Sequence, residues 1–159
     1  MAYFPLFFDL KGKKVLVAGA GNTAARRICV LHKYGAELTV ITKESSAEVQ
    51  KLADNGQIRL ISESYENGRK QILEESFFLV LTATGDAEAD QLAEEDGRRM
   101  GAFVNVAGEK EHSDFYFPGI AGVGEVTAGV IAGGTNHRLA KQMTERVQKC
   151  LEGGMEATD

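Results

Sequence analysis

The chain has 159 residues, of which 43% are hydrophobic and 26% are charged, so it is long enough for one packed core with a short appendage. Its formal net charge of −5 argues against a nucleic-acid or anionic-membrane partner, and no apolar stretch approaches the roughly 20 residues that span a bilayer. We therefore expect a cytoplasmic protein, and its two cysteines have no metal-ligand spacing that would predict a metal site.

The first part of the chain alternates between strand and helix patterns. Residues 14–18 form a short apolar run that ends at Gly19, as a buried strand does where it meets a tight turn. Apolar residues then recur at helical spacing, and Gly35 stands where a left-handed C-terminal cap is expected. Strands are predicted at residues 14–18, 38–41 and 58–61, and helices at residues 23–34 and 45–55.

The alternation resumes after a polar, weakly patterned stretch at residues 63–75. Residues 77–81 give the strongest strand signal in the chain, followed by a helix at residues 86–100, with Asp86 as its N-cap, and a strand at residues 102–106. Strands that alternate with helices imply a parallel sheet with right-handed crossovers. The predicted fold class is therefore α/β, a Rossmann-type parallel sheet with helices on both faces.

A short tail follows this core. Beyond Gly108 the pattern indicates two antiparallel strands and a helix at residues 135–151, a β-β-α tail whose exposed strands favour pairing between subunits of a homodimer. We expect a nucleotide-binding domain at residues 1–110, a tail for dimerisation and substrate cover at 111–152, and a disordered C-terminus at 153–159.

The turn after the first strand carries a dinucleotide-binding fingerprint. Gly19-Ala20-Gly21-Asn22-Thr23-Ala24 fits G-x-G-x-x-G/A, between a strand and a helix. Gly19 permits the tight turn, Gly21 lets the backbone approach a pyrophosphate, and Ala24 keeps the helix close to the sheet. The N–H groups at the helix start then hold the anion. The alternative is a tight turn without a ligand.

Three further segments follow strands and are expected at the same edge of the sheet. Glu44 could bind the ribose hydroxyls of NAD, whereas Lys43 could contact the 2′-phosphate of NADP, so the residues leave both cofactors open. Thr82, Ala83 and Thr84 are expected to line the nucleotide cleft. The segment from Asn105 to Gly108 is expected where the nicotinamide meets the substrate, although ordinary turns explain these segments equally well.

An ordered set of short motifs resembles the precorrin-2 dehydrogenase module of siroheme synthases. The opening segment Tyr3-Phe4-Pro5-Leu6-Phe7-Phe8-Asp9-Leu10 resembles the entry of that family and precedes the fingerprint at the family's spacing. The resemblance covers residues 3–151. The other motifs, in the family's order, are Thr82-Ala83-Thr84, Phe103-Val104-Asn105-Val106, Phe115-Tyr116-Phe117-Pro118 and Gly133-Gly134-Thr135.

The resemblance implies NAD-dependent oxidation of precorrin-2 to sirohydrochlorin, on the path to siroheme or cobalamin. The tetrapyrrole would lie over Asn105 and Gly108 and over the turn formed by Gly134, Thr135 and Asn136. NAD is then the expected cofactor, and the protein would orient the substrate while the nicotinamide accepts a hydride.

The sequence also departs from the family pattern. The family's Asn-x-x-Asp motif ends in its proposed acid/base aspartate, but here the motif ends in Gly108. Asp114 is the best substitute for that carboxylate. The family's serine- and proline-containing turn is replaced at residues 132–137, and the chain ends soon after the tail helix, so iron insertion is not expected.

Two other interpretations stay open. One is a non-catalytic homologue that binds a nucleotide or a tetrapyrrole without turnover, because Gly108 has removed the carboxylate. The other is a regulatory Rossmann domain that senses NAD(H) and binds no tetrapyrrole. Fold alone does not choose among them.

Overall fold

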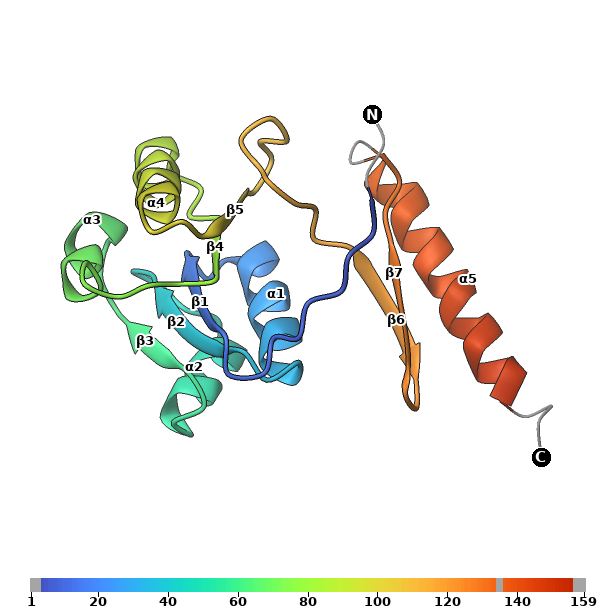
Figure 1. The fold of residues 1–159 in the computed structure, drawn as a ribbon. Helices are drawn as coiled ribbons and strands as arrows, with labels where there is room; N and C mark the ends of the chain where they lie inside the picture. Colours follow the sequence, from blue (N-terminus) through green and yellow to red (C-terminus); the bar gives the residue numbers. More distant parts are fainter. Residues whose placement is uncertain (1–3, 134–135, 156–159) are drawn as a thin grey trace. The chain divides into compact units, whose positions relative to one another are not determined.

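Five strands form a parallel sheet in the order β3-β2-β1-β4-β5 (Figure 1). The structure is a computed structural model, and it describes residues 4–133 and 136–155. This sheet confirms the predicted parallel α/β core. Its strands are β1 (Lys14–Ala18), β2 (Glu37–Ile41), β3 (Arg59–Ile61), β4 (Leu79–Thr82) and β5 (Phe103–Val106).

The central strands are buried on both faces, as their continuous apolar sequences require. Residues 15–18 of β1 have no exposed surface, and Val80 of β4 is equally buried. In the register of the sheet, Val17 pairs with Val40 and with Leu81, and Leu81 pairs with Asn105. The carboxyl ends of β1, β2, β4 and β5 therefore meet at one edge of the sheet.

The largest shift from the predicted strands is at β4, which begins at Leu79 and not at residue 77. Phe78 already donates its backbone N–H to the carbonyl oxygen of Lys14 (2.8 Å), so it leads into the ladder. Its ring packs against Phe8 and Phe103, with centroid distances of 5.3 and 5.7 Å. The strand signal in the sequence therefore begins before β4, because Phe78 is apolar for packing at the edge of the sheet where the strands start.

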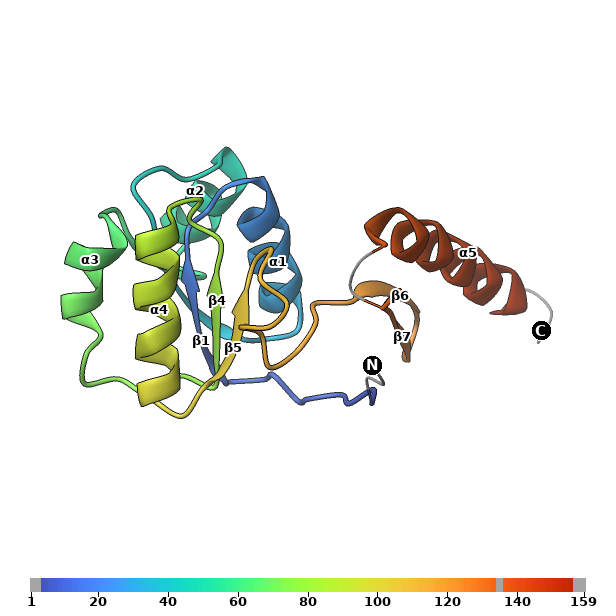
Figure 2. The ribbon, with the colours of Figure 1, turned by 90° about the horizontal axis from the view of Figure 1, so that it is seen from above.

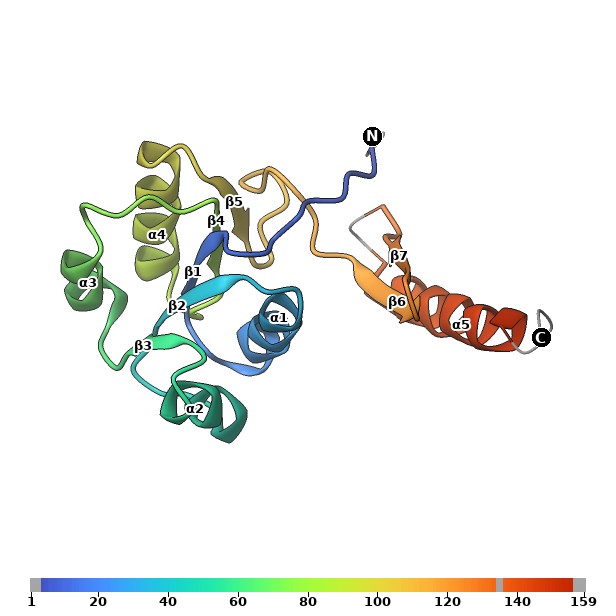
Figure 3. The same cartoon turned by 60° about the horizontal axis from the view of Figure 1, so that its bottom comes forward.

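Helices cover both faces of the sheet, as predicted (Figures 2 and 3). One face carries α1 (Asn22–Lys33) and α2 (Ala47–Asp54), and the opposite face carries α3 (Tyr65–Gly68) and α4 (Ala87–Arg99). Asp86 caps α4 by accepting the N–H groups of Glu88 (3.0 Å) and Ala89 (3.2 Å), which confirms the predicted cap. Gly35 follows α1 with a φ of +78°, the left-handed conformation expected there.

The weakly patterned stretch contains α3 and a short 3₁₀ helix, Arg69–Gln71, that are held to α4 by a buried carboxylate. Asp96 of α4 is 2% exposed and accepts hydrogen bonds from Tyr65 Oη (3.0 Å) and Arg69 Nε (2.6 Å). Arg99 Nη2 is a third donor, at 3.0 Å. Burial raises the pKa of this carboxyl, but the hydrogen bonds from Arg69 and Tyr65 outweigh it, so the pKa lies below its ordinary value.

The chain divides into two compact units, residues 8–115 and residues 4–7 with 116–155, of which 134 and 135 are not described. The second unit contains an antiparallel hairpin, β6 (Gly119–Val123) and β7 (Val126–Val130), and α5 (His137–Met155), which confirms the β-β-α tail. Gln148 of α5 accepts the N–H of Gly122 at 2.8 Å.

The limits of this tail differ in two places from those expected. Residues 111–115 belong to the first unit, and α5 continues to Met155. Residues 153–155, expected to be disordered, are therefore helical, and residues 156–159 lie outside the described part of the chain. Among the helices that the structure describes, none is long and apolar enough to cross a membrane.

Candidate functional site

The turn between β1 and α1 is built so closely against β4 that only glycine fits at its first position. Gly19 has a φ of +95° and donates its N–H to the carbonyl oxygen of Ile41 (2.8 Å). A Cβ atom on Gly19 would lie 2.4 Å from the carbonyl oxygen of Ala83. The glycine thus lets the turn pass between β2 and β4 at the carboxyl edge of the sheet.

The N-terminus of α1 is open at this edge. Gly21 is the N-cap, no side chain caps the helix, and the first turn has no acidic residue. Nothing lies within 4 Å of the position of a Cβ atom on Gly21. The first helical hydrogen bond runs from Ala25 N–H to Gly21 O (2.8 Å), so the preceding N–H groups, of Asn22, Thr23 and Ala24, form the start of the helix. This geometry suits a phosphate anion.

Lys43 and Glu44 follow β2 at the same edge, and both side chains are exposed. Thr42 shapes this turn, because its hydroxyl donates to the carbonyl oxygen of Glu44 (2.7 Å). Both candidate nucleotide-binding residues therefore lie just after the end of β2, at the carboxyl edge of the sheet.

The end of β4 contains a buried polar atom. Thr82 is fully buried, and its Oγ1 has no hydrogen-bond partner among the described residues. Thr84 takes part in the turn into α4: its N–H donates to Asp90 Oδ1 (3.0 Å), and its hydroxyl bonds the backbone of Asp86. Ala83 packs against Gly19, so of the three predicted residues Thr82 alone has a buried side-chain oxygen without a partner among the described residues.

Asn105 of β5 is joined to a residue that the sequence reading missed. It is 5% exposed; its Oδ1 accepts a hydrogen bond from Arg27 Nη1 (2.7 Å), and its Nδ2 donates to the carbonyl oxygen of Phe115 (2.7 Å). Burial lowers the pKa of the Arg27 guanidinium. Arg27 lies among the sheet-facing residues of α1, next to buried Ile28. Charged residues are rarely buried, so an arginine at such a position was the sequence signal that could have identified this residue.

Gly108 turns at the end of β5, into open space. It has a φ of +88°, and nothing lies within 4 Å of the position of a Cβ atom. The turn is closed by the N–H of Glu109, which donates to the carbonyl oxygen of Val106 (3.1 Å). A side chain at position 108 would therefore be accommodated sterically but would carry backbone strain.

Asp114 lies beside the body of β5. Its Oδ2 accepts the N–H of Val104 (2.7 Å), its Oδ1 accepts from Arg98 Nη1 (2.8 Å), and its own N–H donates to the carbonyl oxygen of Val104. Ser113 acts similarly, accepting the N–H of Val106 through Oγ (3.0 Å). These contacts pair the free edge of the sheet and favour a structural role for Asp114.

The other predicted substrate residues belong to the second unit. Asn136 precedes α5, and its Oδ1 accepts the N–H of Leu139 (2.9 Å), as an N-cap does. Gly134 and Thr135 lie outside the described residues. The structure thus brings the fingerprint, Lys43, Glu44, Thr82 and Asn105 into one unit, and it gives Asn136 a capping contact in the other.

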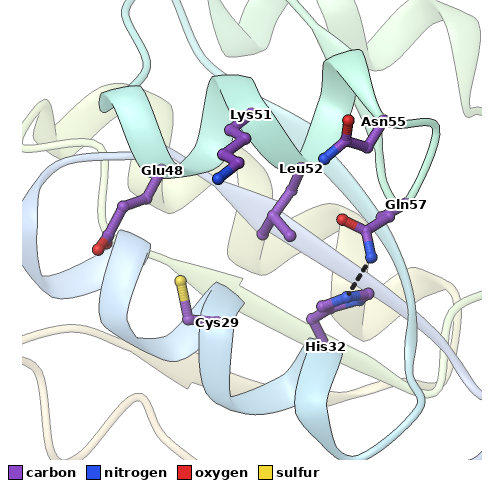
Figure 4. Close-up of a pocket in the computed structure, with 7 residues that line it drawn as sticks. All are labelled: Cys29, His32, Glu48, Lys51, Leu52, Asn55 and Gln57. Carbon is purple, nitrogen blue, oxygen red and sulfur yellow. Dashed lines mark hydrogen bonds between the residues drawn. The ribbon is translucent and has the colours of Figure 1, made fainter.

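A shallow hollow of about 300 Å³ lies between α1 and α2 (Figure 4). His32 and Gln57 are 3.3 Å apart there. Burial, and then the charge of Glu48, raise the pKa of Cys29, so this thiol is not activated. No group of three metal-binding side chains occurs among the described residues. The hollow is lined by Cys29, His32, Glu48, Lys51, Leu52, Asn55 and Gln57.

Comparison with known proteins finds relatives whose sequences match nearly the whole chain. A family model described as "Putative NAD(P)-binding" matches residues 6–119. The probable multifunctional siroheme biosynthesis protein HemA of Ruminiclostridium josui is 34% identical over 92% of this chain and 28% of its own length. The siroheme synthase of Methylococcus capsulatus is 34% identical over 95% of this chain and 31% of its own length. The chain thus spans under a third of these two relatives.

A solved structure has a similar fold over both units of the chain. The precorrin-2 dehydrogenase SirC matches with a TM-score of 0.75 and 26% identity, over 92% of this chain and 70% of its own length.

Proposed function

Because this chain belongs to the NAD(P)-binding family whose model matches residues 6–119, we propose that it is an NAD-dependent dehydrogenase that oxidises precorrin-2 to sirohydrochlorin. The observation that carries the proposal is the open start of α1 after Gly19-Ala20-Gly21, in a chain similar over 92% of its length to a precorrin-2 dehydrogenase. A tight turn without a ligand would not need the open space over Gly21.

The residues at the carboxyl edge fit a dinucleotide. The N–H groups of Asn22, Thr23 and Ala24 would hold the pyrophosphate, and the missing side chain of Gly21 leaves room for it. Glu44 would accept hydrogen bonds from the adenosine ribose, which favours NAD, whereas Lys43 would serve a 2′-phosphate. The buried Thr82 hydroxyl lies at the end of β4, which is between β1 and β5 in the sheet.

On the substrate side, the protein orients the tetrapyrrole over the end of β5. Asn105 and Gly108 lie there. Gly134, Thr135 and Asn136 stay proposed as substrate contacts. When bound, NAD⁺ supplies the oxidising power by accepting a hydride, and one proton leaves the substrate. Gly108 has no acidic group and both Asp114 oxygens are already bonded, so this proton would leave to the solvent.

The tail would be completed by a second copy of the chain. The unit that contains the hairpin and α5 exposes apolar side chains, which often mark an interface. Val126 is 52% exposed and Leu139 is 44% exposed. A homodimer would cover them. A nicotinamide-dependent reaction of this kind fits the cytoplasm, where the cell's nicotinamide pool is available.

An anaerobic assay with purified precorrin-2 and NAD⁺ tests the proposal. We expect NADH and sirohydrochlorin to form together, well above a control without protein. Binding of NAD⁺ is measured in the same preparation. Nucleotide and tetrapyrrole binding without turnover would overturn the proposal and identify a non-catalytic homologue. Nucleotide binding without tetrapyrrole binding would instead identify a domain that senses NAD(H).

A further inference from the structure

From the edges of the two sheets we propose that β7 pairs with β7 of a second copy of the chain, antiparallel and with Ala128 on the two-fold axis. Two hairpins would then form one four-stranded sheet in the order β6-β7-β7-β6. The inference rests on the homodimer of the proposed function, because it names the surface through which the copies meet. It concerns the second unit alone, since the hairpin and α5 both belong to residues 116–155.

Of the four strand edges that the structure describes, three are protected against the addition of another strand. The edge strand β3 is three residues long and carries Arg59, and short, charged edge strands resist pairing. The edge at β5 is closed by the loop that contains Asp114, which accepts the N–H of Val104 (2.7 Å). Gln148 of α5 closes the edge at β6, because it bonds both the N–H (2.8 Å) and the carbonyl oxygen (3.3 Å) of Gly122.

The edge at β7 has none of these protections. On the side away from β6, no described residue pairs with this strand. Its sequence, residues 126–130, contains neither a charged residue nor a proline. An open, uncharged edge strand is a template on which another chain can pair. The β7 edge is therefore the place in the described residues where strand addition is favoured.

The backbone groups that β7 directs outward are those of Thr127 and Gly129. Gly122 directs its N–H and carbonyl oxygen to Gln148, and therefore away from β7. Its pair with Thr127 is thus a non-hydrogen-bonded pair of the ladder. Such pairs alternate with hydrogen-bonded pairs along an antiparallel ladder, so Gly129 also directs its backbone groups outward.

One antiparallel register uses all of these outward groups. With Ala128 on the two-fold axis, Thr127 pairs with Gly129 of the second copy, and Gly129 pairs with its Thr127. Ala128 then meets its own counterpart in a non-hydrogen-bonded pair, where the Cα atoms are about 4.5 Å apart and a small side chain fits. Val126, which is 52% exposed, gains Val130 of the second copy as its neighbour.

The helix α5 has an apolar flank on the side of this open edge. It runs alongside the hairpin (Figure 1) and covers the face that contains Gly119, because a Cβ atom there would collide with Thr144. Leu139 and Met143 lie about 180° and 140° around the helix from Gln148, which reaches the outer edge of β6. They therefore lie on the flank toward β7, and both are exposed (44% and 37%). A second copy would cover them.

The distribution of charge suits a second copy of the same chain as the partner. Each copy has a formal net charge of −5, so the surface at which two copies meet should be uncharged. β7, Leu139 and Met143 fit this requirement. Glu125, next to β7, would face position 131 of the second copy, so the two Glu125 carboxylates would be about 20 Å apart along the sheet, where salt screens their repulsion. A parallel pairing would place them side by side.

Sedimentation equilibrium of the full chain tests the pairing. We expect the unchanged chain to form a dimer, and Thr127→Pro to raise the Kd of that dimer about tenfold or more. Proline removes the outward N–H of Thr127 but leaves the hydrogen bonds to β6 in place. Thr127→Val is the matched control, because it keeps this N–H and the branched shape, and its dimer Kd should be unchanged. Circular dichroism shows whether both variants fold.

Cysteine crosslinking tests the register without a change to the backbone, and it decides alone if Thr127→Pro does not fold. Ala128→Cys and Val126→Cys are compared in a chain that carries Cys150→Ser, because Cys150 is exposed. The two Ala128 Cα atoms would lie within reach of a disulfide, whereas the two Val126 residues would be about 13 Å apart along the sheet. We therefore expect the intermolecular disulfide to form about tenfold faster in Ala128→Cys than in Val126→Cys.

The outcomes separate this inference from the proposed function. Equal dimer Kd values for folded Thr127→Pro and Thr127→Val, or equal crosslinking rates at positions 126 and 128, would overturn the pairing and leave the homodimer in place. A chain that stays monomeric would overturn both. The precorrin-2 assay decides the dehydrogenase activity separately, because it measures NADH and sirohydrochlorin and not the association of the copies.

Discussion

The carbonyl oxygen of Ala83 stands 2.4 Å from the place that a Cβ atom of Gly19 would occupy. Gly19→Ala therefore meets backbone and not a movable side chain, and it also forces an L-residue to a φ of +95°. We expect the free energy of unfolding to fall by about 2 kcal/mol or more. Urea unfolding measures this loss.

The control for that change is Gly56→Ala. Gly56 also has a positive φ, of +69°, but nothing lies within 4 Å of its Cβ position. We expect Gly56→Ala to lower the free energy of unfolding by about 1 kcal/mol, because backbone strain is its sole cost. Equal losses at the two positions would contradict the close approach of Ala83.

Gly21→Asp should separate stability from nucleotide binding. Gly21 already has the extended backbone of an N-cap, its Cβ position is open, and aspartate is a better cap. We expect the free energy of unfolding to rise by a few tenths of a kcal/mol, while repulsion of the pyrophosphate weakens NAD⁺ binding at least tenfold. Calorimetric titration measures the change in NAD⁺ binding, and thermal unfolding measures the change in stability. Gly153→Asp, also at an open position, should leave NAD⁺ binding unchanged.

Gly108→Asp restores the carboxylate at the position where the family has its aspartate. The space around the Cβ position is open, and the φ of +88° costs about 1 kcal/mol of stability. We expect kcat/KM for precorrin-2 to rise severalfold, because a positioned base replaces water. Gly108→Asn has the same shape and strain but no base, so a similar rise in that variant would refute the explanation.

Two buried or half-buried hydroxyls should respond oppositely to removal. Thr82 Oγ1 has no partner among the described residues, so Thr82→Val should be neutral or stabilising. Ser113 Oγ accepts the N–H of Val106 at 3.0 Å, so Ser113→Ala should cost about 1 kcal/mol. The midpoints of denaturant-induced unfolding of the two variants and of the unchanged chain measure both effects. A clear loss in Thr82→Val would mean that its hydroxyl has a partner, such as an ordered water.

Acid should unfold the chain partly through Asp96. The pKa of this carboxyl is lowered in the fold from its ordinary value of 3.8. Its stabilising contribution is therefore complete above the pKa of the unfolded chain and is lost as pH falls through the lower, folded pKa. We expect a falling free energy of unfolding below about pH 4. Asp96→Asn should flatten that fall, and an unchanged pH profile would contradict the assignment.

Local pattern was enough to predict the core from the sequence. Each local feature of the core depends on neighbours within a few residues. These features are the apolar runs of β1 and β2, the helical spacing of α1, the caps at Gly35 and Asp86, and the turn from Gly19 to Ala24. Backbone propensity, capping and burial act at that range. For the same reason the order of strands and helices, and with it the carboxyl edge, followed from the sequence.

The pairing of distant side chains was decided by the tertiary structure. Arg27 and Asn105 are 78 residues apart in the sequence. They meet only because a single strand, β4, separates β5 from β1 in the sheet. Asp114, the predicted substitute acid, is bonded to Val104 and Arg98 because its loop folds back along β5. A sequence shows which residues could do chemistry, but the distance between two side chains depends on how strands are ordered and where loops return.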